Sequence, residues 1–462
     1  MTSGPATFDR RLIAPMLVGS VLNPINSSML AVALIPIGAT FGVPPSQTAW
    51  LVSALYLATS IGQPVVGRLI DSFGPRRLYL VSTALVGVAG LLGTLAPSFA
   101  FLVLARVLLG FGTCAGYPAA MYLIRSESER TGLRSPAGVL TALTISTQTV
   151  AVVGPTLGGL LIDVGGWRAT LGINVPLGVL SFVLGHRFLP HTAPGARPRI
   201  DYPGILFFVG GLVALLVYLM EARTSLLWLL AITAIGAVAF VWWERRRDDP
   251  FIDVRVLAGN APLVATYVRS FAASTVSYAF MYGFTQWMEE GRGLSASVAG
   301  LVLLPTFATG LIVSSLTGRR PEIKGKITVG AITQVLVCVL LLLVHPHTAI
   351  WMLVVIALLT GIPQGLVNLG NQNALYYQAD PARMGSSAGL LRTFMYLGAI
   401  AASTGNGAFF GARATTPGMH HLAMFMLLVA GAFLAITLVD SSLARVGTAD
   451  AAVIEEAAGV SG

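Results

Sequence analysis

The chain has 462 residues, of which 55% are apolar and only 10% are charged. Soluble domains carry about 25% charged residues, so this composition excludes a soluble domain of ordinary size and indicates a membrane protein. The formal net charge is +9. The Lys and Arg residues stand between apolar stretches rather than on one basic face, which argues against binding to nucleic acid.

Fourteen apolar stretches are long enough to be membrane-spanning helices. A hydrocarbon core about 30 Å thick needs roughly 20 residues of helix, and apolar windows of that length recur along the whole chain. The expected spans lie at 12–38, 47–68, 78–96, 99–124, 137–162, 167–189, 203–221, 225–243, 259–287, 296–317, 326–344, 349–375, 386–410 and 420–440. The first stretch is too long for the apolar region of a signal peptide, so we expect it to remain in the mature protein.

Basic residues indicate the orientation of these spans. An even number of spans places both termini on one side, and the loops on that side hold 21 Lys and Arg residues against 4 in the opposite loops. Because loops rich in Lys and Arg stay in the cytoplasm, we expect cytoplasmic termini. We expect a monomer that crosses the cell membrane several times and contacts membrane lipids. In a bacterium this membrane is the inner membrane.

An internal repeat relates the two ends of the chain at a constant offset of 251 residues. The aligned pairs are Gly67 and Gly318, Arg68 and Arg319, Asp71 and Glu322, Gly74 and Gly325, Gly110 and Gly361, residues 137–138 and 388–389, and Gly154 and Gly405. Six spans need only about 180 residues, loops included. The offset therefore leaves an insert between two related halves.

The repeat predicts the domain organisation. Residues 1–189 and 259–440 are expected to form two pseudo-symmetric six-helix bundles. Residues 190–258 are expected to form an inserted two-helix hairpin with cytoplasmic linkers. Residues 441–462 are expected to be a disordered cytoplasmic tail. The predicted fold class is all-α integral membrane, with 14 spans arranged as six plus two plus six.

The loop after the second span has glycine, acidic and basic residues at a fixed spacing. They are Gly67, Arg68, Asp71, Gly74, Arg76 and Arg77. Arginines at a cytoplasmic helix end also bind anionic lipid, but that role does not need an aspartate between two glycines. The string resembles the signature loop of the major facilitator superfamily. The resemblance implies that fold and a gating role, in which the aspartate faces helix dipoles and arginines across the interface between the halves.

Arg106 lies within the fourth expected span, where a charged side chain is costly and usually faces an interior cavity. Snorkelling to the nearer membrane surface is the alternative. Residues 104–112 around it resemble the second motif of the same superfamily. In that motif the arginine hydrogen-bonds to the first span and is associated with proton coupling.

The fifth span carries Gly154, Pro155, Gly158 and Gly159. Proline bends a helix and glycines allow a neighbouring helix to approach closely, so ordinary packing would also explain them. The spacing resembles the motif of the exporting, antiporter branches of the superfamily, although Val150 replaces a usual earlier glycine.

Two further strings, at 167–178 and 250–255, resemble the fourteen-helix drug:proton antiporter family. The extra central helix pair of that family also fits the insert at 190–258. This resemblance covers the whole chain. It implies secondary active export of amphipathic organic compounds by alternating access, with protons as the coupling ion.

The first span departs from that family, because Asn26 stands where the family has an acid. An amide cannot carry a proton, and we find none of the 19 acidic residues in the middle of a span. Asp163, Glu289 and Glu290 lie near outer ends and are the candidate proton carriers. The alternative is that these acids are simply solvated at the outer surface.

The remaining polar residues of the central spans are the candidate substrate cavity. They are Asn23, Asn26, Tyr56, Gln63, Tyr117, Gln148, Tyr278, Tyr282, Gln286, Gln364, Asn368 and Asn371. Each could instead form a hydrogen bond between helices. Aromatic and amide groups without an acid suit an amphipathic neutral or weakly charged compound. Arg269 and Arg392 lie just inside cytoplasmic span ends, and we expect both to snorkel.

Two other functions stay open at this stage. An uncoupled facilitator or lipid-type translocator on the same fold would explain the missing membrane acid. An integral membrane enzyme would need a cluster of acids or histidines, but the six histidines have no metal-ligand spacing and no metal or cofactor is expected. They are His186, His191, His345, His347, His420 and His421.

Overall fold

A computed structural model describes residues 8–43, 45–132, 137–191, 200–221, 224–248, 250–294, 296–318, 322–411 and 413–445. Within these ranges the chain forms helices joined by short turns. The α-helices are α1 Ile13–Phe41, α2 Pro45–Phe73, α3 Pro75–Thr94, α4 Phe99–Gly112, α5 Gly116–Thr131, α6 Ala137–Gly172, α7 Asn174–Phe188, α8 Tyr202–Glu221, α9 Trp228–Glu244, α10 Val254–Gly259, α11 Ala261–Gln286, α12 Ala296–Thr317, α13 Lys324–Leu341, α14 Ile350–Gln378, α15 Met384–Phe410, α16 Thr416–Val439 and α17 Ser442–Arg445. A π-helical turn, η3 Trp287–Gly291, extends α11.

Helices occupy all fourteen stretches that hydropathy predicts. By length and composition, eight of the described helices could cross a membrane, or up to ten when each of two bent pairs is one span. The apolar helix α9 has 17 residues and is shorter than a usual span. The structure therefore shows an all-helical membrane fold, and the count of fourteen spans stays a prediction.

Two helix breaks at or beside glycines differ from the expected pattern of spans. The fourth span is divided between α4 and α5, which are separated by Thr113 to Ala115. In α6, Gly165 and Gly166 have non-helical backbone angles, and Gly166 has φ of 67°. This break falls between the expected spans 137–162 and 167–189, so α6 contains the fifth span and the start of the sixth.

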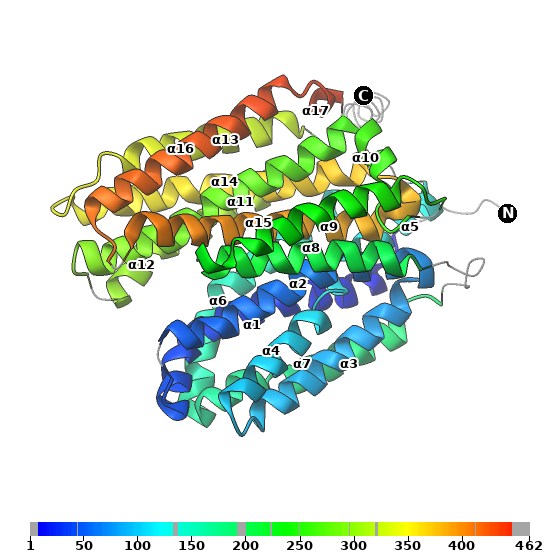
Figure 1. Cartoon of the computed structure of the whole chain (residues 1–462), viewed down its shortest axis with the longest axis horizontal. Helices are drawn as coiled ribbons and strands as arrows, with labels where there is room; N and C mark the ends of the chain where they lie inside the picture. Colours follow the sequence, from blue (N-terminus) through cyan, green and yellow to red (C-terminus); the bar gives the residue numbers. More distant parts are fainter. Residues whose placement is uncertain are drawn as a thin grey trace, which may run out of the picture.

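The helices form two groups that meet along two seams. In Figure 1 the helices α1–α4, α6 and α7 lie below α11–α16, with the pair α8 and α9 between them. Across the boundary, α2 packs along α15, and α6 packs along α12 and α14. The predicted bundle boundaries are not tested by these contacts and stay predictions.

Both ends of the described chain lie at one end of the molecule, which we call the terminal end. Leu12 belongs to the same apolar cluster as Leu263 near the start of α11. After α16, Asp440 forms an ion pair with Arg269, also near the start of α11. Which side of the membrane this end faces stays a prediction.

The 251-residue offset reappears in helix packing. A Cβ added at Gly110 would lie 2.6 Å from the Cβ of Ala58 and 2.9 Å from the carbonyl oxygen of Leu55. The equivalent Gly361 packs against Thr309 and Thr306, which are the residues 251 positions after Ala58 and Leu55. Identical packing in both groups supports the repeat. Gly154 and Gly405 do not follow it, because Gly154 faces Ser28 whereas Gly405 faces Phe425.

The hairpin of α8 and α9 lies against the seam between α2 and α15. Leu212 and Leu216 of α8 share an apolar cluster with Ile61 of α2 and with Leu397 of α15. At its terminal end, the buried Phe251 packs its ring 5.5 Å from that of Phe208. The pair thus contacts both groups from one side, through α8.

Several residues that the topology argument uses lie outside the described ranges. They are Arg134, Arg197, Arg199, Arg223, Arg319 and Arg320. Most of the predicted tail, from residue 446 onward, also lies outside them.

Candidate substrate site and gate

Asp71 joins the two groups at the terminal end. Its carboxylate accepts hydrogen bonds from the backbone N–H groups of Gly385 and Ser386, each at 2.8 Å, and from the Ser386 hydroxyl at 2.5 Å. Gly385 and Ser386 belong to the first turn of α15, where backbone N–H groups lack helical partners and the helix dipole is positive. The expected contact between Asp71 and a helix dipole is therefore present in the structure.

Glycines bring α2 and α15 into backbone contact beside Asp71. A Cβ on Gly67 would collide with the carbonyl oxygen of Gly385, and one on Gly389 would collide with the carbonyl oxygen of Gln63. Farther along the same seam, the Thr393 hydroxyl donates to the Ser60 carbonyl at 3.0 Å. The seam is thus closed over about three helical turns.

The other four predicted gate residues have different surroundings. Gly74 has φ of 85° and precedes α3, so it supplies the turn that ends α2. Arg76 donates to the carbonyl of His186 at 2.7 Å and contacts the ring of His191, both in its own group. Arg77 is exposed, and Arg68 lies close enough to Asp71 to act on its charge. Among the described residues, Arg76 therefore has its contacts within its own group, and its gating role stays a prediction.

The second seam is formed by α6 with α12 and α14. Gln148 donates from Nε2 to the carbonyl of Gln364 at 3.1 Å, and its Oε1 accepts from the Ser314 hydroxyl at 3.3 Å. At the terminal end a Cβ on Gly318 would collide with the Thr141 side chain. Gln148 and Gln364 were expected in the cavity. The Gln148 side chain instead ties the helices of this seam together, whereas Gln364 takes part through its backbone carbonyl and its place in the cavity stays a prediction.

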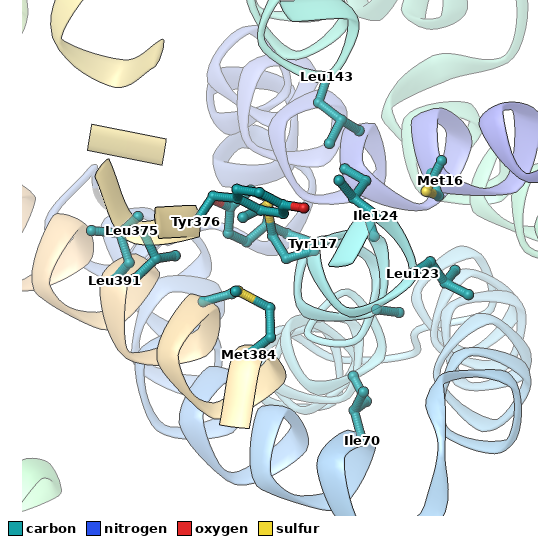
Figure 2. Close-up of a cluster of buried hydrophobic side chains, with 14 of the residues drawn as sticks. Met16, Ile70, Tyr117, Leu123, Ile124, Leu143, Leu375, Tyr376, Met384 and Leu391 are labelled. Carbon is teal, nitrogen blue, oxygen red and sulfur yellow. The ribbon is translucent and has the colours of Figure 1, made fainter. Parts of the chain in front are cut away.

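An apolar cluster fills the space between the seams at the terminal end. Figure 2 shows side chains of α14 and α15 facing side chains of α2 and α5 within it. The labelled members of these helices are Leu375, Tyr376, Met384, Leu391, Ile70, Tyr117, Leu123 and Ile124. No comparable cluster of the described residues joins the two groups at the opposite end, where the large clusters each belong to one group. The structure is closed at the terminal end.

Next to this closure, and sharing Tyr117 with it, lies a set of polar and aromatic side chains from both groups, which we call the central polar cluster. Its members are Asn23, Tyr56, Thr113, Tyr117, Tyr278, Tyr282, Arg392 and Tyr396. Tyr396 donates to Asn23 Oδ1 at 3.0 Å, and Asn23 Nδ2 donates to the Thr113 hydroxyl at 3.0 Å. This chain crosses from α15 through α1 to the end of α4.

Tyrosines form most of the central polar cluster. The ring of Tyr56 lies 5.6 Å from that of Tyr396, and the rings of Tyr278 and Tyr282 are 5.9 Å apart. Tyr282 also interacts with the Tyr56 hydroxyl. Rings with a polar tip can hold both the apolar body and the polar groups of a ligand.

Arg392 is part of this cluster and does not snorkel. Its guanidinium carbon lies 3.9 Å from the centre of the Tyr117 ring, across the boundary between α15 and α5. Arg269 does not snorkel either, because it is fully buried and pairs with Asp440 at 2.5 Å. The expectation for both arginines was wrong, because a sequence does not show which face of a helix meets a partner.

Asn26 is not available to a substrate. It is 2% exposed and forms a reciprocal pair with Asn174 of α7, with N···O distances of 2.6 and 2.8 Å. Its Nδ2 also donates to the Leu22 carbonyl at 2.8 Å. At the position where the family has an acid, this chain therefore has a hydrogen bond between two helices, so Asn26 is no cavity residue in this structure.

The remaining predicted cavity residues are dispersed. Gln63 and Asn371 are buried, and the side-chain oxygen of each has no hydrogen-bond partner. Gln286 and Asn368 are exposed. Five of the twelve predicted residues, Asn23, Tyr56, Tyr117, Tyr278 and Tyr282, belong to the central polar cluster.

Arg106 is 1% exposed and donates from Nε to the carbonyl of Leu51 at 3.1 Å, while its Nη2 has no partner. Leu51 is in α2, and among the described residues Arg106 has no hydrogen bond to the first span of the kind that the resemblance implies. Tyr56, one and a half turns along α2 from Leu51, lies within electrostatic range of the guanidinium. Arg106 therefore lies within electrostatic range of the central polar cluster, toward the end opposite the gate.

The three candidate proton carriers lie at the surface. Asp163, next to the break in α6, is exposed, and so are Glu289 and Glu290 in the π-helical turn. Glu290 accepts from the backbone N–H of Ala414 at 2.7 Å and thus holds the loop before α16. The structure shows no contact between these acids and the central polar cluster among the described residues.

The glycine motif of the fifth span packs against α1. A Cβ at Gly154 would collide with the Ser28 side chain, and one at Gly158 would lie 2.8 Å from Val32. A Cβ at Gly159 would meet nothing within 4 Å. Beside Pro155, α6 bends by 43°. Two of the three glycines thus allow the close helix contact that their spacing predicts.

Sequence reasoning missed Thr113, Arg392 and Tyr396. The residue equivalent to Tyr396 in the first half of the repeat is Ile145, 251 positions earlier. Because Ile145 is apolar, the repeat does not mark this position as polar. Thr113 lies at the break between α4 and α5. The sequence predicts one continuous helix there, so it does not predict the position of the Thr113 side chain.

The comparison with known families identifies the fold. The family model described as Major Facilitator Superfamily matches residues 16–403. The chain belongs to the major facilitator superfamily. It is 33% identical over 431 residues to the uncharacterized MFS-type transporter YwoD of Bacillus subtilis, which covers 90% of this chain and 93% of that protein.

More distant relatives include resistance proteins. Multidrug resistance protein Stp of Mycobacterium tuberculosis is 31% identical over 64% of this chain, and this match spans 55% of the length of Stp. Puromycin resistance protein pur8 of Streptomyces alboniger is 31% identical over 66% of this chain and 61% of its own length.

A solved structure shares the fold. The human organic anion transporter MFSD10 is matched with a TM-score of 0.66 over 92% of this chain and 99% of that chain, at 16% identity. The protein is thus a multi-pass membrane transporter of the superfamily and not an enzyme.

Proposed function

We propose that this transporter exports amphipathic organic compounds by alternating access. The observation that carries the proposal is a polar and aromatic cluster between two helix groups, next to a closure at the terminal end made by Asp71, paired glycines and an apolar cluster. A binding site that both groups share changes its exposure when the groups rock against each other. The resistance proteins among the relatives support a drug-like substrate.

The proposed orientation places the terminal end in the cytoplasm of a bacterial cell, with fourteen spans. Basic loops at the chain ends support this orientation. The described state is then closed to the cytoplasm, and the central polar cluster is reached from outside. Export follows when the closure opens, the compound enters from the cytoplasm, and the groups return to the described state.

Proton antiport is the proposed energy source, with Asp163 or the pair Glu289 and Glu290 as carriers. A second candidate is transport without a proton gradient. The Asn26–Asn174 pair favours it, because the position that holds an acid in related antiporters is filled here by a bonded amide.

Transport into inside-out vesicles with a panel of amphipathic dyes tests the proposal. Uptake that rises with an imposed pH gradient, and falls in Asp163→Asn or Glu289→Gln/Glu290→Gln, supports antiport. Uptake that is equal with and without the gradient supports the second candidate. No uptake of any dye in the panel would contradict export itself.

A further inference from the structure

Arg392 is an arginine without an ion-pair partner in the middle of the protein. It is half-buried on α15, and the one hydrogen bond of its side chain within the described part of the chain runs from Nη1 to the Met395 sulfur, at 3.6 Å. The interior Arg269 differs, because it is paired with Asp440. Among the described residues, neither Arg392 nor Arg106 has an acid within ion-pair distance.

The surroundings of Arg392 supply hydroxyl groups but no carboxylate. The side chains of Tyr117, Tyr278 and Tyr396 lie within electrostatic range of its charge. Phenolic O–H groups donate hydrogen bonds readily. A cation and several donors in a poorly hydrated site stabilise an anion, whereas a cationic guest would meet repulsion.

The position of Arg392 suits a ligand rather than the gate. It follows Gly385 by seven residues, which is about 10 Å along α15, so it lies beyond the Asp71 closure. Its guanidinium face is covered by the Tyr117 ring. Stacking on an aromatic ring leaves the N–H edge of the guanidinium free to bind an oxyanion in a bidentate manner.

We propose that the compound bound at the central polar cluster is an amphipathic organic anion whose oxyanion group binds Arg392 and whose apolar body packs among the tyrosines. This inference rests on the proposed function and specifies the class of its substrate. Arg106, with its unpartnered Nη2 at the far side of the cluster, adds a second positive charge. Without a bound anion, both charges are held in the interior uncompensated, which is costly in a membrane protein.

Two dyes with one ring system test the charge preference. Carboxyfluorescein is anionic and rhodamine 6G is cationic, and both share the xanthene core. In inside-out vesicles that contain the full chain, we expect carboxyfluorescein uptake at least tenfold above rhodamine 6G uptake. Arg392→Gln should lower carboxyfluorescein uptake at least tenfold, and Arg392→Lys should lower it less, because it keeps the charge.

Arg125→Gln is the matched control. Arg125 also lies over a tyrosine, Tyr376, at 5.4 Å, but at the terminal end and paired with Glu129. Its replacement should leave the dye preference unchanged. Binding of carboxyfluorescein to the detergent-solubilised protein, followed by fluorescence anisotropy, should weaken in Arg392→Gln by the same factor as uptake.

The possible outcomes separate the two proposals. Uptake of rhodamine 6G in preference to carboxyfluorescein would overturn the anion inference and leave export standing. Equal losses for both dyes in Arg392→Gln would assign Arg392 a packing role and also overturn it. Uptake and binding of neither dye by the parent would contradict both the inference and the proposed site.

Discussion

At the scale of single residues, Asp71 is the clearest link between sequence and mechanism. Its carboxylate makes three hydrogen bonds to the start of α15, and hydrogen bonds to a charged group contribute about 1.5–3 kcal/mol each. Asp71→Asn removes the charge and replaces one acceptor oxygen with a donor. We expect transport to fall at least tenfold while the amount of protein inserted in the membrane stays normal.

The measurement for Asp71→Asn is dye uptake per unit of inserted protein. Glu129→Gln is the control, because Glu129 is an exposed acid at the same end of the molecule, paired with Arg125 at 2.9 Å. Near-normal uptake by Asp71→Asn would contradict the gating role.

The Asn26–Asn174 pair should contribute to the stability of the folded protein rather than to substrate binding. Asn26→Ala leaves the Asn174 side-chain oxygen buried without its donor, while Asn174 Nδ2 keeps its bond to the Leu171 carbonyl. A buried acceptor without a partner costs about 1–3 kcal/mol, so the melting temperature should fall. Replacing both residues by Leu should restore part of that loss, because no unpaired amide remains. Lost transport at an unchanged melting temperature would show instead that Asn26 contacts the substrate.

Glu244 should make the stability depend on pH. It follows the expected span 225–243 and is fully buried. Burial, together with the nearby Asp201 carboxylate, raises the pKa of Glu244 from 4.5 to about 8. Between pH 4.5 and about pH 8, the Glu244 carboxyl is deprotonated in the unfolded chain but still protonated in the folded protein. Folding therefore becomes less favourable as pH rises through this range.

We therefore expect the melting temperature of the parent to fall from pH 6 to pH 9, and that of Glu244→Gln to fall less. Differential scanning fluorimetry of the purified protein measures both curves, with Glu129→Gln as a control that should follow the parent. Parallel curves for the parent and Glu244→Gln would assign the pH dependence to other groups.

At the scale of elements, the glycine pair created by the repeat offers a matched experiment. Gly389 lies against the Gln63 backbone in the seam, whereas its equivalent, Gly138, has no neighbour within 4 Å of an added Cβ. Gly138→Ala should stabilise α6 by up to about 1 kcal/mol through helix propensity. Gly389→Ala should separate α2 from α15 and lower transport severalfold.

Melting temperature and dye uptake of the two glycine variants show whether transport needs the close approach of α2 and α15. Equal behaviour of Gly389→Ala and Gly138→Ala would show that the close approach of α2 and α15 is not needed. A loss confined to Gly389→Ala supports the seam as the closure.

Hydropathy predicts where helices lie, since long apolar runs leave few other structures in lipid. It does not predict the break at Thr113 to Ala115, because small residues occur in continuous spans as well as at breaks. The role of Asp71 could be predicted because its spacing between glycines is unusual. The roles of Asn26 and Arg392 could not, because they depend on Asn174 and Tyr117, which are 148 and 275 residues away.

At the scale of the whole molecule, two seams and an apolar cluster close one end, while the central polar cluster lies beyond them. The hairpin of α8 and α9 rests on the first seam and contacts both groups through α8. Alternating access requires that opening at the terminal end accompanies closing at the opposite end. The two ends should therefore respond in opposite directions to a change at Asp71.

Spin-label distances at both ends test this claim most directly. One pair is placed at the exposed residues Ser126 and Ala382 of the terminal end, and the other at the exposed Val164 and His347, each in a background without the two buried cysteines. In Asp71→Asn, we predict a new population with a longer distance for the first pair and a shorter distance for the second. Unchanged distances, or lengthening of both pairs together, would contradict alternating access around the central polar cluster.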